Sequence, residues 1–266
     1  MAADYPNMDL GNPRQFKAAV QNIHNLYNAT PEQVRNTGAQ WYDRVNDAVS
    51  KGVRGRNMST LQGAGLVAAV SPNMDWERNN IDAFKELAGL SSQDWAHIQK
   101  SASGGKRSSE SKAATAGLGI STAPDGNLMK ARRIMDGEDV ESVLDRRGAP
   151  KTNSFMHNIA EPQANGFVTI DGRAHDVAAN RLQPWTSGRG IGSANTKTGK
   201  KTRYEHFEDS YRTAARSIAE EHGVLHLPHQ LQAIVWEGGK QIERSGTTKS
   251  GKPRQKGVAR LGQPYL

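Results

Sequence analysis

The stretch that decides the fold is residues 128–180, LMKARRIMDGEDVESVLDRRGAPKTNSFMHNIAEPQANGFVTIDGRAHDVAAN. Apolar residues at helical spacing predict a short helix that ends at Leu144. A turn at Gly148–Pro150 follows, because glycine and proline interrupt helices and proline suits the first position of the next one. Lys151 then opens a further helix. The sequence therefore predicts a helix-hairpin-helix over about residues 138–160.

An extended run, GFVTID at residues 166–171, comes after this hairpin. It is the one strand-like segment, and it ends at Asp171, before Gly172. A carboxylate in this position can stabilise an oxocarbenium-like sugar or activate a nucleophile. The competing interpretation is that Asp171 only forms an Asx-type turn. His175 and Asp176 offer metal-ligand atoms, but without a His-x-x-x-His pattern we expect a capping or surface role for them and no metal site.

Helical patterns dominate the rest of the chain, so we predict a mostly α fold. Asn12–Pro13 indicates a helix start, and Thr30–Gln33 is typical of a capping box opening a second helix that reaches Val49. Gly223 is expected to end a long helix, and Pro228 to start the last one.

The net charge of +8 is carried almost entirely by the C-terminal third. Residues 1–185 have 21 basic and 20 acidic side chains, whereas residues 186–266 have 14 and 7. We expect one helical domain over 1–237 with a basic loop at 186–203, and a basic tail at 238–266. Such segments favour a polyanion-binding arm, and a solvated linker and tail are the alternative.

The absence of cysteine excludes disulfides, Cys-ligated zinc, iron–sulfur clusters and thiol nucleophiles. The N-terminal residues lack a signal-peptide pattern, and no apolar run is long enough to cross a bilayer. The sequence therefore favours a soluble, cytoplasmic protein that does not contact membranes. It leaves the oligomeric state open.

The order and spacing of these features resemble the helix-hairpin-helix DNA glycosylase superfamily, of the endonuclease III and adenine glycosylase kind. Members carry a K-A-x-x-I helix, here Lys130–Ile134, before a hairpin whose K-T pair matches Lys151–Thr152. Their aspartate segment, V-D-T-H, is similar to Val168–Asp171 with His175 further along. Upstream, Leu66–Asn73 resembles the family's L-x-S-x-Q-T segment.

This resemblance implies a helix-hairpin-helix glycosylase-like fold and an action on a flipped-out nucleotide in double-stranded DNA. It implies that Asp171 is the catalytic carboxylate, that Lys151 is a hairpin contact or an amine nucleophile, and that Asn73 fills the gap left by the base. Phage proteins with S-P-N-x-x-W-E-R-N and V-T-I-D-x-x-A patterns also resemble the chain, and they have been linked to hypermodified thymine. Base excision and base modification therefore both stay open as activities, and we expect no cofactor for either.

The hairpin also has a physical rationale as a DNA contact, since N–H groups at a helix N-terminus favour phosphate. The expected DNA-binding residues include Asn73, which would fill the gap left by the base. The others lie on the hairpin (Arg147, Gly148 and Thr152), just after the aspartate (Arg173) and in the basic loop (Lys200 and Lys201). Two further functions remain open, a non-catalytic DNA-binding protein that keeps the scaffold and a phage structural protein whose basic arms meet DNA.

Overall fold

The structure is a computed structural model of the chain, and it describes residues 8–71, 87, 90–104, 108–116, 125–164, 166–180 and 202–245. Every regular element in these ranges is a helix, which confirms the mostly α prediction. The chain divides into a central unit, residues 42–162, and a terminal unit, residues 1–41 with 163–266. Helices from both ends of the sequence share the core of the terminal unit, and the expected domain over 1–237 stays a prediction.

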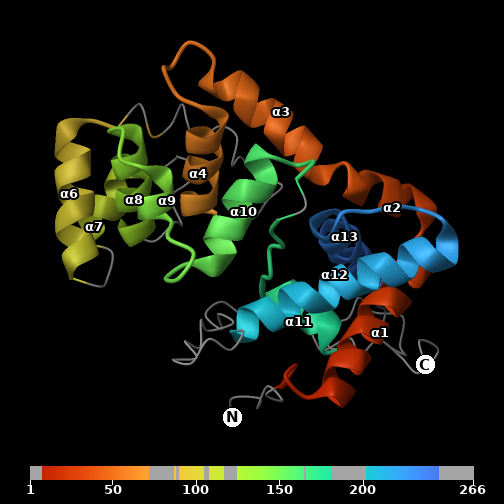
Figure 1. The fold of residues 1–266 in the computed structure, drawn as a ribbon. Coiled ribbons are helices and arrows are strands. Elements are labelled where there is room, and N and C mark those ends of the chain that lie inside the picture. Colours follow the sequence, from red (N-terminus) through yellow and green to blue (C-terminus); the bar gives the residue numbers. More distant parts are fainter. Residues whose placement is uncertain are drawn as a thin grey trace. The chain divides into compact units, whose positions relative to one another are not determined.

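The terminal unit consists of five described helices (Figure 1), namely α1 (Pro13–Ala29), α2 (Glu32–Ala39), α11 (Gly172–Ala178), α12 (Arg203–His222) and α13 (Pro228–Ser245). Helix α1 packs against α11, α12 and α13, and α2 packs along α13. Their apolar faces form a core that includes Ile23, Leu26, Phe207, Ile218 and Ile234, each fully buried. This burial is the main term that stabilises the unit.

The ends of these helices follow the expected capping chemistry. The Asn12 side chain accepts hydrogen bonds from the first-turn amides of α1, with Pro13 as the first helical residue. Gly223, in the left-handed conformation at φ 66°, ends α12, and α13 begins at Pro228. Helix α13 continues to Ser245, so residues 238–245 of the expected tail are helical, and residues 246–266 lie outside the described ranges.

The prediction of a capping box at Thr30 is wrong. The Thr30 hydroxyl donates to the carbonyl of Leu26 at 2.7 Å and therefore ends α1 instead of starting α2. Helix α2 has Pro31 at its N-cap with no side-chain cap, and it stops at Ala39. A separate helix, α3 (Trp41–Val53), follows, so the long helix expected to reach Val49 is two helices.

The run 166–171 is extended, but no strand occurs in the described residues, because side chains of α12 satisfy its backbone. The hydroxyl of Tyr204 accepts from the N–H of Ile170 at 2.9 Å and donates to the carbonyl of Val168 at 3.0 Å. The Glu208 carboxylate, buried in the core, accepts from the N–H of Val168 at 3.2 Å. A neighbouring helix thus substitutes for the pairing that a second strand would give.

We expect Tyr204→Phe to lower the free energy of unfolding by about 1–3 kcal/mol, because it leaves a buried amide and a buried carbonyl without this partner. Tyr27→Phe is the matched control, since Tyr27 is also buried but its hydroxyl lies 3.0 Å from the partly exposed side chain of His226. Urea denaturation of both variants measures the difference, and equal losses would contradict this role of Tyr204.

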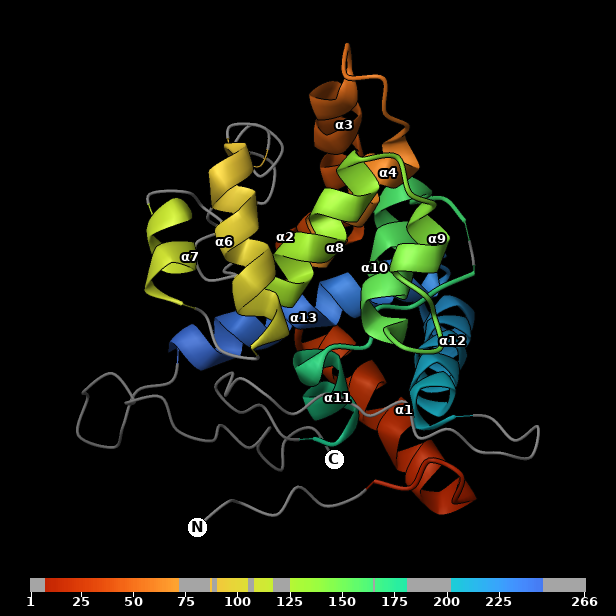
Figure 2. The same ribbon diagram turned by 90° about the vertical axis from the view of Figure 1, so that its left-hand side faces the viewer.

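The central unit is built around α4 (Thr60–Val70), whose residues 63–70 are all buried. A helix that is apolar on every side belongs in a core. The surrounding described helices are α3, α6 (Ser92–Ser103), α7 (Ser109–Ala114), α8 (Asp125–Met135), α9 (Val140–Val143) and α10 (Pro150–Ala160). Helices α8 and α10 both contact α4, and Figure 2 shows α6 beside α7 and α8. Within the described ranges no helix is both long and apolar enough for a membrane span.

Candidate functional site

The hairpin in the central unit joins α9 to α10 by a turn that Asp145 closes. The Asp145 carboxylate Oδ2 accepts from the N–H of Gly148 at 3.1 Å, and the Asp145 carbonyl accepts from the N–H of Ala149 at 2.8 Å. Pro150 then starts α10. Two short helices therefore meet across a tight turn at the place where the sequence predicted a hairpin.

A buried amide holds the inner side of this hairpin. Asn153, 1% exposed, donates from Nδ2 to the Leu144 carbonyl at 2.9 Å and to Glu141 Oε2 at 3.0 Å. Because Glu141 lies on α9 and Asn153 on α10, this side chain links the two helices across the turn.

The geometry changes which amides of the hairpin can face a phosphate. The N–H groups of Gly148 and Ala149 both donate to Asp145 inside the turn, and the expected DNA contact of Gly148 stays a prediction. Lys151 and Thr152 lie in the first turn of α10, where a helix leaves its N–H groups without intrahelical acceptors, and Ala149 supplies no side-chain cap. Arg147, which is exposed, and Lys151, which is partly exposed, supply basic side chains at this turn, and Thr152 adds a hydroxyl.

In the terminal unit, both oxygens of Asp171 are held in place. Asp171 is the N-cap of α11, and its Oδ1 accepts from the N–H of Ala174 at 2.7 Å. Its Oδ2 accepts from the indole Nε1 of Trp236, on α13, at 3.2 Å. Asp171 is partly exposed, so a carboxylate with a defined orientation remains accessible at the start of the helix.

Two cations lie against the same indole ring. The Arg173 guanidinium carbon is 5.6 Å from the centre of the Trp236 ring, and the Lys240 ammonium is 4.2 Å from it. Lys240 also pairs with Glu237 at 3.3 Å. Trp236 and Lys240 were missed in the sequence, where nothing in α13 indicates that Trp236 approaches Asp171, 65 positions away.

His175 and Asp176 are buried, which excludes the surface role that was one of the two expected for them. His175 Nδ1 lies 3.2 Å from Asp176 Oδ1, and the His175 ring packs on Phe207 with centroids 4.9 Å apart. Beside them, burial first and then the charges of Asp171 and Asp176 raise the pKa of the Tyr211 hydroxyl. Tyr211 therefore stays protonated and donates to the Ala174 carbonyl at 2.9 Å, which secures the first turn of α11.

The predicted site residues thus form two sets, each described by itself. Arg147, Gly148, Lys151 and Thr152 belong to the hairpin of the central unit, and Asp171 and Arg173 belong to the start of α11 in the terminal unit. Asn73, Lys200 and Lys201 lie outside the described residues.

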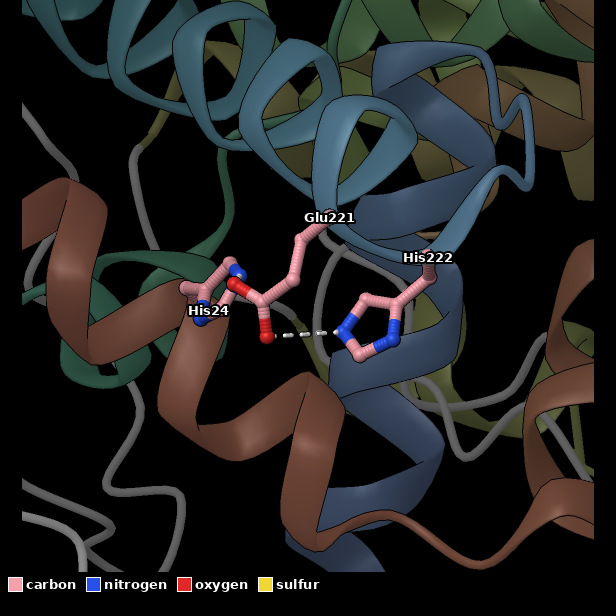
Figure 3. Close-up of side chains that lie close together, drawn as sticks. All are labelled: His24, Glu221 and His222. Carbon is pink, nitrogen blue, oxygen red and sulfur yellow. Dashed lines mark ion pairs between the residues drawn. The ribbon is translucent and has the colours of Figure 1, made fainter.

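A third set was not expected from the sequence. His24 on α1 and Glu221 and His222 at the end of α12 place one ligand atom each within 4.8 Å of one another (Figure 3). The separation of 197 positions between His24 and Glu221 hides this group from any local motif. It is the one group in the described ranges that combines three side chains of metal-binding type.

Among known protein families, the model of a family of unknown function, DUF7178, matches residues 7–238 of the chain. No curated protein and no solved structure matches it.

Proposed function

Because the chain belongs to DUF7178, a family of unknown function, its activity has to be inferred from its own residues, and we propose an enzyme that acts on a DNA base held out of the duplex, with Asp171 as its catalytic carboxylate. The observation that carries this proposal is the fixed, accessible carboxylate of Asp171, bonded to Trp236, whose indole ring also carries the cations Arg173 and Lys240.

The chemistry needs an anion near a carbon that loses its leaving group. When a base leaves its sugar with the bonding electron pair, positive charge develops on C1′ and the ring oxygen, and water then completes the substitution. In thymine hypermodification, pyrophosphate leaves an exocyclic carbon of the base, and an incoming nucleophile takes its place. A carboxylate already oriented by Ala174 and Trp236 can stabilise either electron-poor carbon without first reorganising.

Phosphate groups would be met by cations in both units. In the terminal unit these cations are Arg173 and Lys240, which both lie against Trp236, the residue that donates to Asp171. In the hairpin, we assign Arg147, Lys151 and Thr152 to one DNA strand, with Lys151 as a phosphate contact rather than a nucleophile, because contacts of this kind position DNA without reading its sequence. The tight turn between α9 and α10 and, separately, the fixed Asp171 carboxylate support a helix-hairpin-helix, glycosylase-like interpretation of the mostly α fold.

The test is incubation of the full chain with duplex oligonucleotides that carry damaged or modified bases, including a pyrophosphorylated hydroxymethyl base. Alkali-labile abasic sites would identify base excision, and an increase in nucleoside mass would identify transfer. Binding to any duplex with no product from any substrate would overturn the proposal of an enzyme. It would favour the alternative, a non-catalytic, sequence-independent DNA-binding protein.

The basic C-terminal segment is expected to add salt-dependent DNA affinity. Deleting residues 246–266 leaves α13 whole and removes five Lys and Arg side chains with no acidic ones. The slope of log Kd against log salt should then become shallower by up to about 4.5, since each neutralised phosphate contributes about 0.9. The control replaces these five residues with glutamine at constant length and should behave like the deletion. An unchanged slope in the deletion would mean that the segment does not contact DNA.

A further inference from the structure

We propose that His24, Glu221 and His222 bind a divalent transition-metal ion, with Zn²⁺ as the ion that best fits their donor atoms. All three side chains belong to the terminal unit, and Figure 3 shows them converging from α1 and from the end of α12. His24 Nε2 lies 3.0 Å from Glu221 Oε2, and His222 Nε2 lies 3.3 Å from Glu221 Oε1.

The distances fit a shared ion. Zinc binds imidazole nitrogen and carboxylate oxygen at about 2.0–2.2 Å, so neighbouring ligand atoms in a tetrahedral site lie about 3.3–3.6 Å apart. The two separations are at or slightly below this range, each nitrogen facing a different oxygen of the Glu221 carboxylate, and all three ligand atoms lie within 4.8 Å of one another. Two histidines and one carboxylate are also a ligand set that zinc sites use when the remaining position is left to water.

The orientation of His24 argues for a ligand beyond the carboxylate. His24 is 7% exposed, and its Nε2 is a buried atom that makes no hydrogen bond, although Glu221 Oε2 is only 3.0 Å away. A buried nitrogen that is close to a carboxylate but not aligned with it has lost its hydrogen bonds to water, and no hydrogen bond within the protein compensates for the cost in free energy. A metal ion between the two groups would use the lone pairs of both.

The surroundings support a cation at this position. Glu221 and His222 lie in the last turn of α12, where the helix dipole places partial negative charge. Asn28 Oδ1 lies 2.9 Å from His222 Nε2, and it offers a further oxygen to the ion or to a water on it. Because Glu221 and His222 are exposed, solvent reaches the open side of the site. The ion would fasten α1 to the end of α12.

The experiment uses the full, untagged chain after treatment with a chelator and dialysis. Addition of Zn²⁺ is expected to give one bound ion per chain by elemental analysis and a single site by calorimetry. It should also raise the melting temperature by about 5–10 °C when free zinc exceeds Kd a hundredfold. Co²⁺ in place of zinc should show the intense visible absorption of a four-coordinate ion.

Matched variants separate this site from adventitious binding. Glu221→Gln and His222→Gln should each weaken zinc binding at least tenfold and remove the gain in melting temperature. Both alter exposed side chains, so the fold should be retained without the metal. Glu220→Gln makes the same charge change one residue earlier, and His206→Gln removes a histidine from the other end of α12; both should bind like the parent chain. Failure of the parent chain to bind zinc, or equal affinity in Glu221→Gln and Glu220→Gln, would overturn the proposal.

Discussion

Asp171→Asn is expected to lower turnover on the DNA substrate about a hundredfold or more while leaving DNA affinity within about twofold. Removing one group that stabilises transition-state charge commonly costs this much in rate. Asparagine caps a helix nearly as well as aspartate does, so the hydrogen bond to the N–H of Ala174 can persist. The charge is lost, and the bond from Trp236 to Oδ2 is lost with it when the amide nitrogen occupies that position.

The control for this variant is Asp139→Asn. Asp139 is the N-cap of α9, and its carboxylate accepts from the N–H of Ser142 at 2.9 Å, so it loses the same charge at the same kind of position. We expect Asp139→Asn to retain nearly full turnover. Initial rates on substrate and gel-shift titrations on the same duplex measure the two quantities. Full activity in Asp171→Asn would remove Asp171 from the chemistry, even if the protein proves to be an enzyme.

Local chemistry explains the parts of the fold that the sequence could predict. The helix ends at Asn12–Pro13, Gly223 and Pro228 depend on backbone groups within a few residues of these positions. A short stretch of sequence is therefore enough to predict them. Asp171 belongs to the same class, because the bond to Ala174 that caps α11 spans three residues. The predicted residue was therefore found at a helix N-cap, whatever its role in catalysis.

Long-range contacts explain the parts that the sequence could not predict. The Thr30 side chain could bond either to the amides that follow it, as a helix cap, or to the Leu26 carbonyl that precedes it. The sequence does not show which bond forms, because the choice depends on the packing of Gly238, from α13, against Thr30. Trp236 meets Asp171, and His24 meets Glu221, across 65 and 197 residues. No periodicity or spacing rule carries such information, so the neighbours of the candidate carboxylate and the proposed metal ligands become visible only in three dimensions.

Gly38→Ala is expected to destabilise the terminal unit by about 1–3 kcal/mol. A Cβ at residue 38 would lie 2.6 Å from the Cα and 3.0 Å from the N of Ile234, which are backbone atoms of α13 and cannot rotate away. Overpacking a core in this way costs about 1–3 kcal/mol or more, and the better helix propensity of alanine returns up to about 1 kcal/mol. The free energy of unfolding in urea, followed by circular dichroism, measures the net loss.

Gly126→Ala is the comparison that separates crowding from helix propensity. Gly126 also lies within a helix, α8, but no atom stands within 4 Å of a Cβ built there, so alanine should stabilise the protein slightly. If Gly38→Ala is equally harmless, α2 and α13 are not packed as closely as the structure has them. If α13 instead shifts to admit the methyl group, Trp236 moves with it, because it follows Ile234 by two residues on the same helix. Its bond to Asp171 then lengthens, and Gly38→Ala should slow turnover even at temperatures where the variant is fully folded.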